Sequence, residues 1–178
     1  EIDWNSSTVR YKGFTSEAKI YPMTINVSEI ERIATSPRAL EYEDQFRSTT
    51  RETSLIVRVD RAEPNRNIVR GFKAYELLLA QHQELRGKIS FLAFLVLSRT
   101  HIRQYQRYMD EINEITAKIN DSYGTDTWKP IQIFLENNYS QAIAGLKLYD
   151  VLLINTIIEG MNLVAKEGPI VNSRDGVL

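Results

Sequence analysis

The chain has 178 residues, of which 43% are hydrophobic and 25% charged, a balance typical of one folded domain with a buried core. Its formal net charge of -1 shows no excess of basic residues, which argues against a nucleic-acid-binding protein. It contains no cysteine and only two histidines, so a disulfide framework and a thiolate metal site are excluded. We therefore expect no nucleic-acid partner and no metal site, and a cytoplasmic setting.

Two further features concern membranes and targeting. The most apolar stretches, residues 89–97 and 151–158, are shorter than the roughly 18 residues of a membrane-spanning helix, so we expect no membrane partner. The chain opens at Glu1 without a basic-then-apolar leader. We expect no secretion signal and a segment of a longer polypeptide.

Residues 1–50 are expected to lead into the main domain, and their extended stretches have no core of their own. Stretches 8–14 and 18–25 are rich in Val, Ile, Tyr and Thr without a helical repeat, and they predict two strands. Pro37 opens a charged helix that runs to about residue 48. We expect residues 1–50 to be lead-in strands and linker helices from a domain junction.

Residues 51–178 predict a second unit in which apolar strands alternate with amphipathic helices. Thr100 and Asn162 are the expected N-caps of two of these helices. In chain order, the expected elements are a strand at 54–60, a helix at 67–85, a strand at 89–97, a helix from Thr100 to Gly124, a strand at 131–135, a helix at 140–149, a strand at 151–155, a helix from Asn162, and a fifth strand beginning at Val177.

This alternation predicts an α/β fold in which a doubly wound, Rossmann-like parallel sheet is buried on both faces. Such sheets bind ligands at the carboxyl ends of their strands. The loops expected to carry function are therefore 61–67, 98–100, 136–139 and 156–162.

The loop after the first of these strands places two arginines, Arg61 and Arg66, beside the start of a helix. Backbone amides at a helix start favour an anion, and each guanidinium can bridge two phosphate oxygens, so a diphosphate is a natural ligand. The alternative is that both arginines are solvated, or that one of them pairs with Glu63. No turn carries the G-x-G-x-x-G or G-x-x-x-x-G-K-[ST] pattern, so we expect no dinucleotide cofactor.

Residues 159–167 form the richest polar segment. Asn162 is expected to cap a helix whose first amides, those of Leu163 and Val164, point into the cleft, where a phosphate could bind. Glu159 could accept hydrogen bonds from sugar hydroxyls, and Glu167 could reach a ribose diol. Gly160 would allow a tight turn close to a ligand. The alternative is helix capping with solvated surface charge.

Arg99 ends the second of these strands at the same edge of the sheet. An arginine at this position has little structural purpose unless it meets an anion or an acidic neighbour, and an acceptor phosphate is one candidate.

Four motifs, in this order along the chain, together resemble the trehalose-6-phosphate synthase family of retaining GT-B glycosyltransferases. They are VDR at 59–61, Ser98-Arg99 followed by Tyr105-Gln106, GTDTWKPI at 124–131 and GMNLVAKE at 160–167. The last motif is the most specific. The similarity extends from about Val9 to the end of the chain.

The resemblance implies that residues 51–178 are the nucleotide-sugar-binding, C-terminal half of a GT-B fold, truncated at its C-terminus. By analogy Arg61 and Arg66 would hold the donor diphosphate as the catalytic groups, and Arg99 would bind the acceptor phosphate. Glu167 would bind the ribose. The donor sugar and phosphate would contact the run Glu159, Gly160, Met161, Asn162, Leu163 and Val164. The implied partners are a nucleoside diphosphate sugar, a sugar phosphate and the missing N-terminal domain; a homo-oligomer stays open, and no metal or cofactor is implied.

Two departures from the family pattern leave the substrate open. The family's Asp-Tyr-x-Lys-Gly sequence is replaced by residues 63–67, EPNRN, and its usual aspartate is Glu159. The changed loop resembles the pseudo-glycosyltransferase branch of validoxylamine type, which uses a nucleotide-linked cyclitol. A non-catalytic sensor of nucleotide sugars or sugar phosphates is the alternative from another class. The missing glycine fingerprint weakens a third alternative, a flavin or nicotinamide enzyme.

Overall fold

A computed structural model describes residues 1–50 and 53–178 of the chain, which opens with a small antiparallel sheet. Its strands are β1 (Ile2–Asp3), β2 (Thr8–Tyr11) and β3 (Phe14–Glu17). Lys12 and Gly13 have φ values of 49° and 82°, the positive values that a two-residue hairpin turn requires. The turn interrupts the strand predicted at 8–14, which is therefore wrong beyond Tyr11.

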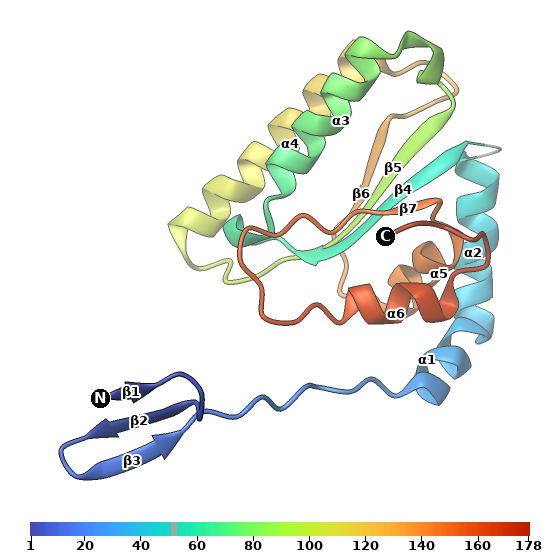
Figure 1. Ribbon diagram of the computed structural model, residues 1–178. Coiled ribbons are helices and arrows are strands. Elements are labelled where there is room, and N and C mark those ends of the chain that lie inside the picture. The colour runs from blue at the N-terminus through green and yellow to red at the C-terminus, as the bar shows by residue number, and fades with distance from the viewer. Residues whose placement is uncertain (51–52) are drawn as a thin grey trace.

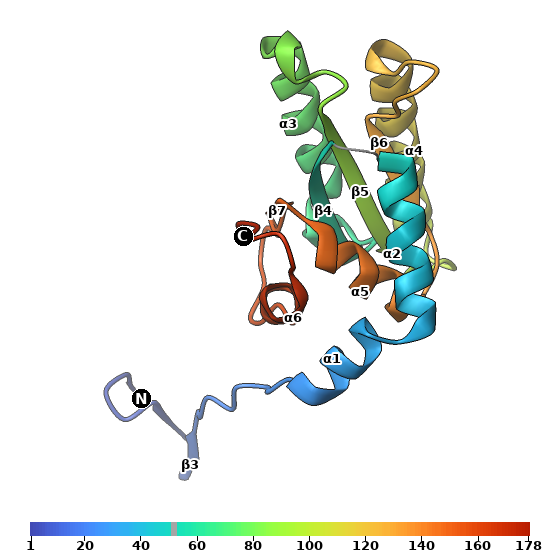
Figure 2. The same cartoon turned by 90° about the vertical axis from the view of Figure 1, so that its right-hand side faces the viewer.

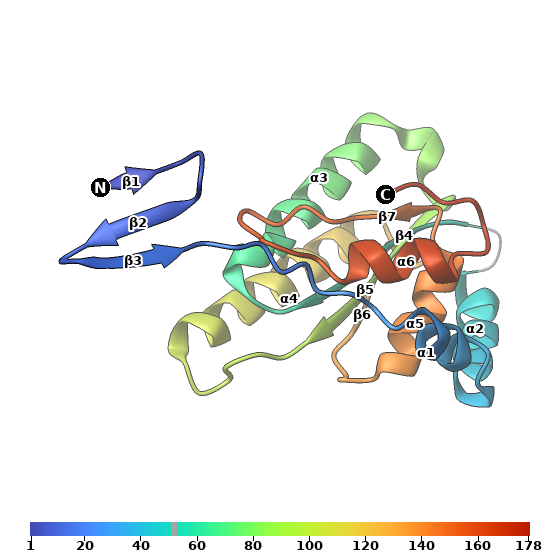
Figure 3. The ribbon, with the colours of Figure 1, turned by 60° about the horizontal axis from the view of Figure 1, so that its bottom comes forward.

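The strand predicted at 18–25 is wrong, because residues 18–26 have no regular structure. No strand of the described chain pairs with them, and an extended segment becomes a strand only when its backbone groups find such a partner. The segment instead passes beside helix α6 (Val164–Val171), where Lys166 Nζ donates a hydrogen bond to the Met23 carbonyl at 2.8 Å (Figure 3).

Two helices connect this lead-in to the main sheet. Helix α1 (Val27–Ala34), which the sequence did not predict, begins after Asn26, whose side chain accepts a hydrogen bond from the Glu29 amide at 3.2 Å. Helix α2 (Pro37–Thr50) begins at the predicted proline. The expected boundary between residues 50 and 51 falls at the two residues outside the described part of the chain, so the domain division stays a prediction.

The main sheet has four parallel strands, β4 (Ser54–Arg61), β5 (Ile89–Val96), β6 (Ile131–Phe134) and β7 (Val151–Leu152), in the order β6-β5-β4-β7. Val177 adds a single parallel bridge to Val151 at the β7 edge, where a fifth strand was expected to begin. The order reverses direction between β4 and β7, which is the hallmark of a doubly wound sheet.

Helices cover both faces of this sheet (Figure 2). On one face lie α3 (Ile68–Gln81) and α4 (Arg103–Tyr123), which bury Phe72 and Ile112 against β5. On the other lie α5 (Tyr139–Leu148), α6 and the two linker helices, around a second cluster. Because both faces are covered, the α/β Rossmann-like prediction is confirmed.

Several element boundaries differ from those predicted. Helix α4 begins at Arg103 after Ile102, so Thr100 is not its N-cap. The helix predicted at 67–85 is α3 followed by a separate turn of 3-10 helix, η2 (Gln83–Leu85). Strand β7 ends at Leu152, because the chain beyond it leaves the sheet to form the loop before α6.

Candidate functional site

The loops that follow β4, β5 and β7 meet at the carboxyl edge of the sheet, as expected for a doubly wound fold. The Ser98 hydroxyl donates a hydrogen bond to Glu63 Oε1 at 2.8 Å, which joins the first two loops. The Ile157 amide donates to the Asn65 carbonyl at 2.9 Å, which joins the first and third. The three loops are therefore neighbours at this edge.

Arg66 lies at the centre of this neighbourhood. It ends a turn of 3-10 helix, η1 (Pro64–Arg66), and only 13% of its side chain is exposed. Its guanidinium forms an ion pair with Glu159 through Nη1, and its Nε lies 3.5 Å from Asp60 Oδ1. The following residue, Asn67, has a φ of 59°. Asparagine tolerates this left-handed conformation, and it thus replaces a glycine at the turn.

Arg61, the last residue of β4, behaves differently. Its side chain is 54% exposed and its Nη1 lies 3.2 Å from Glu63 Oε1. The interpretation in which one arginine pairs with Glu63 thus describes Arg61 in this state of the protein. The guanidinium is half exposed and can therefore reach an anionic ligand, whereas Glu63 is only 7% exposed and also accepts the hydrogen bond from Ser98.

Glu159 receives three hydrogen bonds or ion pairs from the loop and its neighbours. Besides Arg66, the Thr156 hydroxyl donates to it at 3.1 Å and the Asn162 amide nitrogen at 2.8 Å. Partial burial acts to raise the pKa of this carboxyl, but the hydrogen bond from Arg66 and the others outweigh it, and the pKa is lowered. Glu159 is therefore a fixed negative charge beside Arg66.

The N-terminus of α6 presents unused donors to this cluster. The Asn162 side chain accepts a hydrogen bond from the Ala165 amide at 3.0 Å, although the helix itself begins at Val164, two residues later than predicted. Within the described chain, no acceptor serves the amides of Leu163 and Val164. These amides are the kind of group that binds a phosphate.

Gly160 lies at a bend in the loop before α6. Its φ is not in the left-handed range, so the conformation of this bend does not itself require a glycine. A Cβ at this position would meet no atom within 4 Å, so packing does not explain it either. The glycine leaves open space beside the loop. The neighbouring Met161 is 37% exposed, and its Sδ lies 4.0 Å from Lys166 Nζ.

Glu167 lies one turn into α6 and accepts a hydrogen bond from the Tyr139 hydroxyl at 3.1 Å. Burial, together with the negative charge of Glu167, raises the pKa of Tyr139 to about 12. The phenol is therefore neutral at physiological pH and can act as the donor to this carboxylate.

Arg99 stands apart from the Arg66–Glu159 cluster, on the loop after β5. Its φ is 46°, its Nη1 lies 3.0 Å from the Tyr105 hydroxyl, and its guanidinium lies 5.5 Å from the centre of the same ring. A hollow of about 220 Å³ opens beside it, lined by Ser98, Tyr105, Gln106 and neighbours. Tyr105 is half-buried and lines this hollow.

The sequence reasoning missed Arg58. It lies within β4, its side chain is 0% exposed, and it donates hydrogen bonds to Asp60 Oδ2 at 2.9 Å, to Asn155 Oδ1 at 2.5 Å and to the Arg66 carbonyl. Burial lowers the pKa of Arg58 and raises that of Asp60, because both charges lose water. The signal was present in the sequence, since an arginine interrupts an otherwise apolar buried strand.

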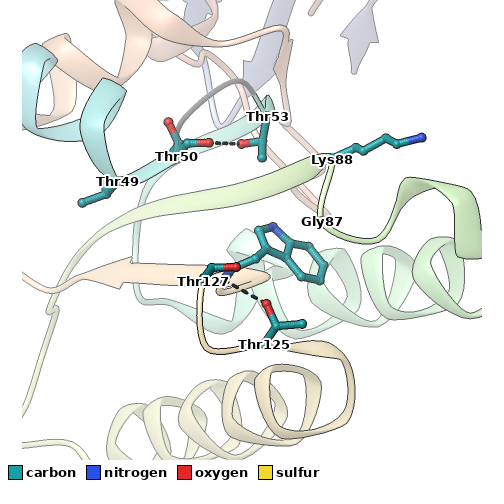
Figure 4. A pocket seen from close by; sticks show the side chains of 8 residues that line it. Thr49, Thr50, Thr53, Gly87, Lys88, Thr125 and Thr127 are labelled. Carbon is teal, nitrogen blue, oxygen red and sulfur yellow. Dashed lines mark hydrogen bonds between the residues drawn. The ribbon is translucent and has the colours of Figure 1, made fainter.

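A larger hollow lies at the opposite, amino-terminal edge of the sheet (Figure 4). It measures about 650 Å³ and is lined largely by threonines, with Lys88 and Trp128. It contains one positive side chain and no acidic one among its described lining residues. Because parallel sheets bind ligands at the carboxyl edge, the cluster around Arg66 is the stronger candidate.

Residues 1–50 and 53–178, which the structure describes, contain neither a membrane-spanning helix nor a metal-binding cluster. No helix there combines the length and the apolar character that crossing a membrane requires. No group of three or more histidine, aspartate or glutamate side chains there is arranged to hold a metal ion.

The doubly wound sheet defines a Rossmann-like domain, and the arginines and open helix amides at its carboxyl edge are groups of the kind that can bind an anion. Comparison with known proteins makes the class specific. All of the chain, residues 1–178, matches glycosyltransferase family 20. The chain belongs to this family, which confirms the resemblance seen in its motifs.

Two of the relatives are named as UDP-forming trehalose-phosphate synthases. The chain is 26% identical over 167 residues to the probable alpha,alpha-trehalose-phosphate synthase [UDP-forming] 4 of Arabidopsis thaliana, covering 93% of this chain and 21% of the relative. It is 28% identical over 160 residues to the 56 kDa subunit of the UDP-forming synthase of Saccharomyces cerevisiae, covering 89% and 32%. The chain thus spans a fifth to a third of the relatives it matches.

The fold comparison agrees. The crystal structure of a UDP-forming alpha,alpha-trehalose-phosphate synthase from Burkholderia xenovorans, in complex with glucose-6-phosphate, superposes with a TM-score of 0.86 at 27% identity. The match covers 93% of this chain and 36% of that one. The Rossmann-like fold of this chain is therefore also that of a solved synthase.

Proposed function

We propose that this chain is the nucleotide-sugar-binding domain of a retaining glycosyltransferase that transfers a hexose from a nucleoside diphosphate sugar to a sugar phosphate. The observation that carries the proposal is the convergence of Arg61, Arg66, Glu159 and the open end of α6 at one edge of the sheet. Guanidinium groups and unused amides suit a diphosphate, and a carboxylate suits sugar hydroxyls. The names of the relatives, which are UDP-forming, support a uridine donor.

Each proposed role follows from position. Arg61 and Arg66 bind the diphosphate, and the amides of Leu163 and Val164 contact one of its phosphates. Glu159 accepts hydrogen bonds from the donor sugar, which lies against the backbone of residues 160–162 in the space left open beside Gly160. The remaining two proposed contacts are the ribose with Glu167 and the acceptor phosphate with Arg99.

The proposed chemistry is electrostatic. The bond from the sugar to the diphosphate breaks as negative charge gathers on the departing phosphate oxygen, where Arg61 and Arg66 stabilise it. The acceptor hydroxyl then attacks from the same face and gives its proton to the departing phosphate oxygen, so the anomeric configuration is retained without a covalent intermediate on the enzyme. No metal is needed in this scheme, because two guanidinium groups and the helix end supply the positive charge.

The ion pair between Arg66 and Glu159 must yield in this scheme. A diphosphate carries more charge than a carboxylate, so it competes successfully for the guanidinium, and Glu159 then turns to the sugar. Donor binding thus exchanges one set of charge-assisted hydrogen bonds for another.

We also propose that residues 51–178 form the donor domain and residues 1–50 the junction with a second, acceptor-binding domain of a longer protein. The lead-in sheet carries large exposed apolar side chains, including Trp4 at 84% and Phe14 at 78%. Apolar surface of this kind needs a covering partner. The short span of the chain along its relatives supports the same view.

The test is transfer by the full-length protein. We expect Arg66→Ala and Arg61→Ala each to lower kcat about a hundredfold, the size of effect seen when one group that stabilises a developing negative charge is lost. The matched control is Arg38→Ala, which removes an exposed arginine on α2 and should leave transfer unchanged.

Two results would contradict the proposal in different ways. Unimpaired transfer by Arg61→Ala and Arg66→Ala would remove these residues from the mechanism. Tight nucleotide-sugar binding by the wild-type protein without any product would instead favour the non-catalytic sensor.

A further inference from the structure

Arg58 is a charged side chain buried where no charge is expected. It lies in a central strand of the sheet, its side chain is fully covered, and its Nε has no hydrogen-bond partner among the described residues. Removing a guanidinium from water is costly unless its donors are well paired. The residue therefore needs a structural or functional reason, and its partners indicate one.

The acceptors of Arg58 belong to the segments that carry the candidate site. Nη2 donates to Asp60 Oδ2 at 2.9 Å and to the Arg66 carbonyl, so it holds both the carboxylate next to Arg66 and the backbone of Arg66 itself. Nη1 donates to Asn155 Oδ1 at 2.5 Å, at the start of the loop that leads to Glu159.

The same two loops are also tied to each other at Arg58. Asn67 Nδ2 donates to the Asn155 carbonyl at 2.9 Å, and Asn155 Nδ2 donates to the Asn67 carbonyl at 3.4 Å. The Arg58 guanidinium therefore lies beside two further hydrogen bonds that join the loop of Arg66 to the loop of Glu159.

Helix α3 makes room for this guanidinium. Gly71 lies within the helix, where glycine is less favourable than alanine. A Cβ at this position would lie 3.0 Å from Arg58 Nη1 and 3.3 Å from Asn155 Nδ2. The glycine thus leaves the space that the Arg58–Asn155 contact occupies.

We infer that Arg58 is a positioning residue for the donor site: through Asp60, Asn155 and the Arg66 carbonyl it holds Arg66 and the loop of Glu159 in the arrangement that receives a diphosphate sugar. This deepens the proposed function and rests on it for the identity of the ligand. Arg58 does not touch the donor, because its side chain is fully covered. Its effect is exerted through Arg66 and the loop of Glu159.

The first test measures loop order without any ligand. In the full-length protein, Arg58→Met removes the donors but keeps an unbranched apolar side chain. We expect the amides of residues 62–67 and 155–162 to exchange hydrogen at least tenfold faster, with β5 and α4 unchanged. The control Ile112→Ala leaves a cavity at a core position on α4 and should not speed up hydrogen exchange specifically in these two loops. Unchanged or uniformly faster exchange in Arg58→Met would overturn the inference.

The second test measures donor affinity by calorimetry with a nucleotide sugar. Arg58→Met should weaken binding about tenfold to a hundredfold in the wild-type background, since small misplacements of a binding group have effects of this size. In the Arg66→Ala background the same change should weaken binding clearly less, because only the loop of Glu159 is then left for Arg58 to position. An equal loss in both backgrounds would overturn the inference, because it would mean that Arg58 acts only on general stability.

A milder variant guards against misfolding. Gly71→Ala raises the helix propensity of α3 while its Cβ displaces the Arg58 guanidinium, so we expect a folded protein with faster exchange in the same two loops. If wild-type protein binds no nucleotide sugar, the proposed function fails, yet the exchange measurements still decide whether Arg58 holds these loops. Normal exchange in Gly71→Ala and Arg58→Met alike would refute the positioning role.

Discussion

The residue that concentrates the charge of the site is Arg66, which contacts Glu159 and approaches Asp60 within one small region. The sequence placed Arg66 and Glu159 at the carboxyl edge of the sheet, because the alternation of strands and helices fixes which loops meet there. Their direct pairing was not predictable, since it depends on side-chain length and loop path. Nor was the burial of Arg58, whose acceptors lie as far away in the chain as Asn155.

The Arg66–Glu159 pair makes stability depend on pH. A carboxylate whose pKa is lowered by folding stabilises the fold above its ordinary pKa of about 4.3, and this contribution is lost as pH falls through the lower, folded-state value. We expect Glu159→Gln to lower the free energy of unfolding by about 1–2 kcal/mol at pH 7, as for a hydrogen-bonded charge.

Urea unfolding of the wild type and Glu159→Gln at pH 7 and pH 3 checks this expectation. The difference between the two proteins should be smaller at pH 3, because the contribution of the carboxylate is lost progressively as pH falls from the ordinary pKa toward the lowered folded-state pKa. A difference that stays constant over this range would mean that the pair does not stabilise the fold.

The size of Glu159 leads to a second prediction at this scale. Glu159→Asp shortens the side chain by one methylene and should break the contact with Arg66 that its length permits. We expect the preference among donor sugars to change by about tenfold in kcat/KM, because this side chain is proposed to read the sugar hydroxyls. Competition between pairs of nucleotide sugars measures the ratio, and an unchanged preference would place Glu159 outside the sugar site.

At the scale of elements, helix α5 packs closely on the sheet through Gly145. A Cβ there would lie 2.3 Å from Phe94 Cε2, and Phe94 is itself stacked on Phe134 with ring centres 4.9 Å apart. We expect Gly145→Ala to destabilise the protein by about 1–3 kcal/mol, as overpacking does. The midpoint of urea unfolding checks this.

The matched control is Gly160→Ala, whose Cβ would meet no atom within 4 Å and should leave the urea midpoint unchanged. If Gly145→Ala also left it unchanged, the close packing of α5 on β5 would be wrong.

The elements also show where sequence patterns suffice. Strands β4 and β5 and helix α5 were predicted within two residues, because long apolar runs and amphipathic repeats leave few alternatives. The strand at 18–25 failed because β-rich composition does not supply a pairing partner. Thr100 failed as a cap because the chain forms another turn before α4 begins at Arg103.

At the scale of the whole molecule, the lead-in sheet lies apart from the helices and the main sheet (Figure 1). Its surface includes basic residues in exposed positions, among them Arg10, Lys12 and Lys19. We expect trypsin to remove residues 1–19 from the 178-residue chain before it attacks the sheet of β4 to β7.

In the full-length protein the same sites should be cut at least tenfold more slowly, because the proposed second domain covers the apolar side chains around them. Mass spectrometry of the timed digests identifies the cuts. Equal rates in the two proteins would contradict a docked lead-in.

The central claim is that the carboxyl edge of this sheet binds a nucleoside diphosphate sugar through Arg66 and its neighbours. The most direct measurement is calorimetry of the full-length protein with a panel of nucleotide sugars, repeated with Arg66→Ala and Arg38→Ala. We predict saturable binding of at least one donor, weakened at least tenfold by Arg66→Ala and unchanged by Arg38→Ala. The claim would be contradicted if Arg66→Ala left the affinity for every donor unchanged, or if the wild-type protein bound no donor at all.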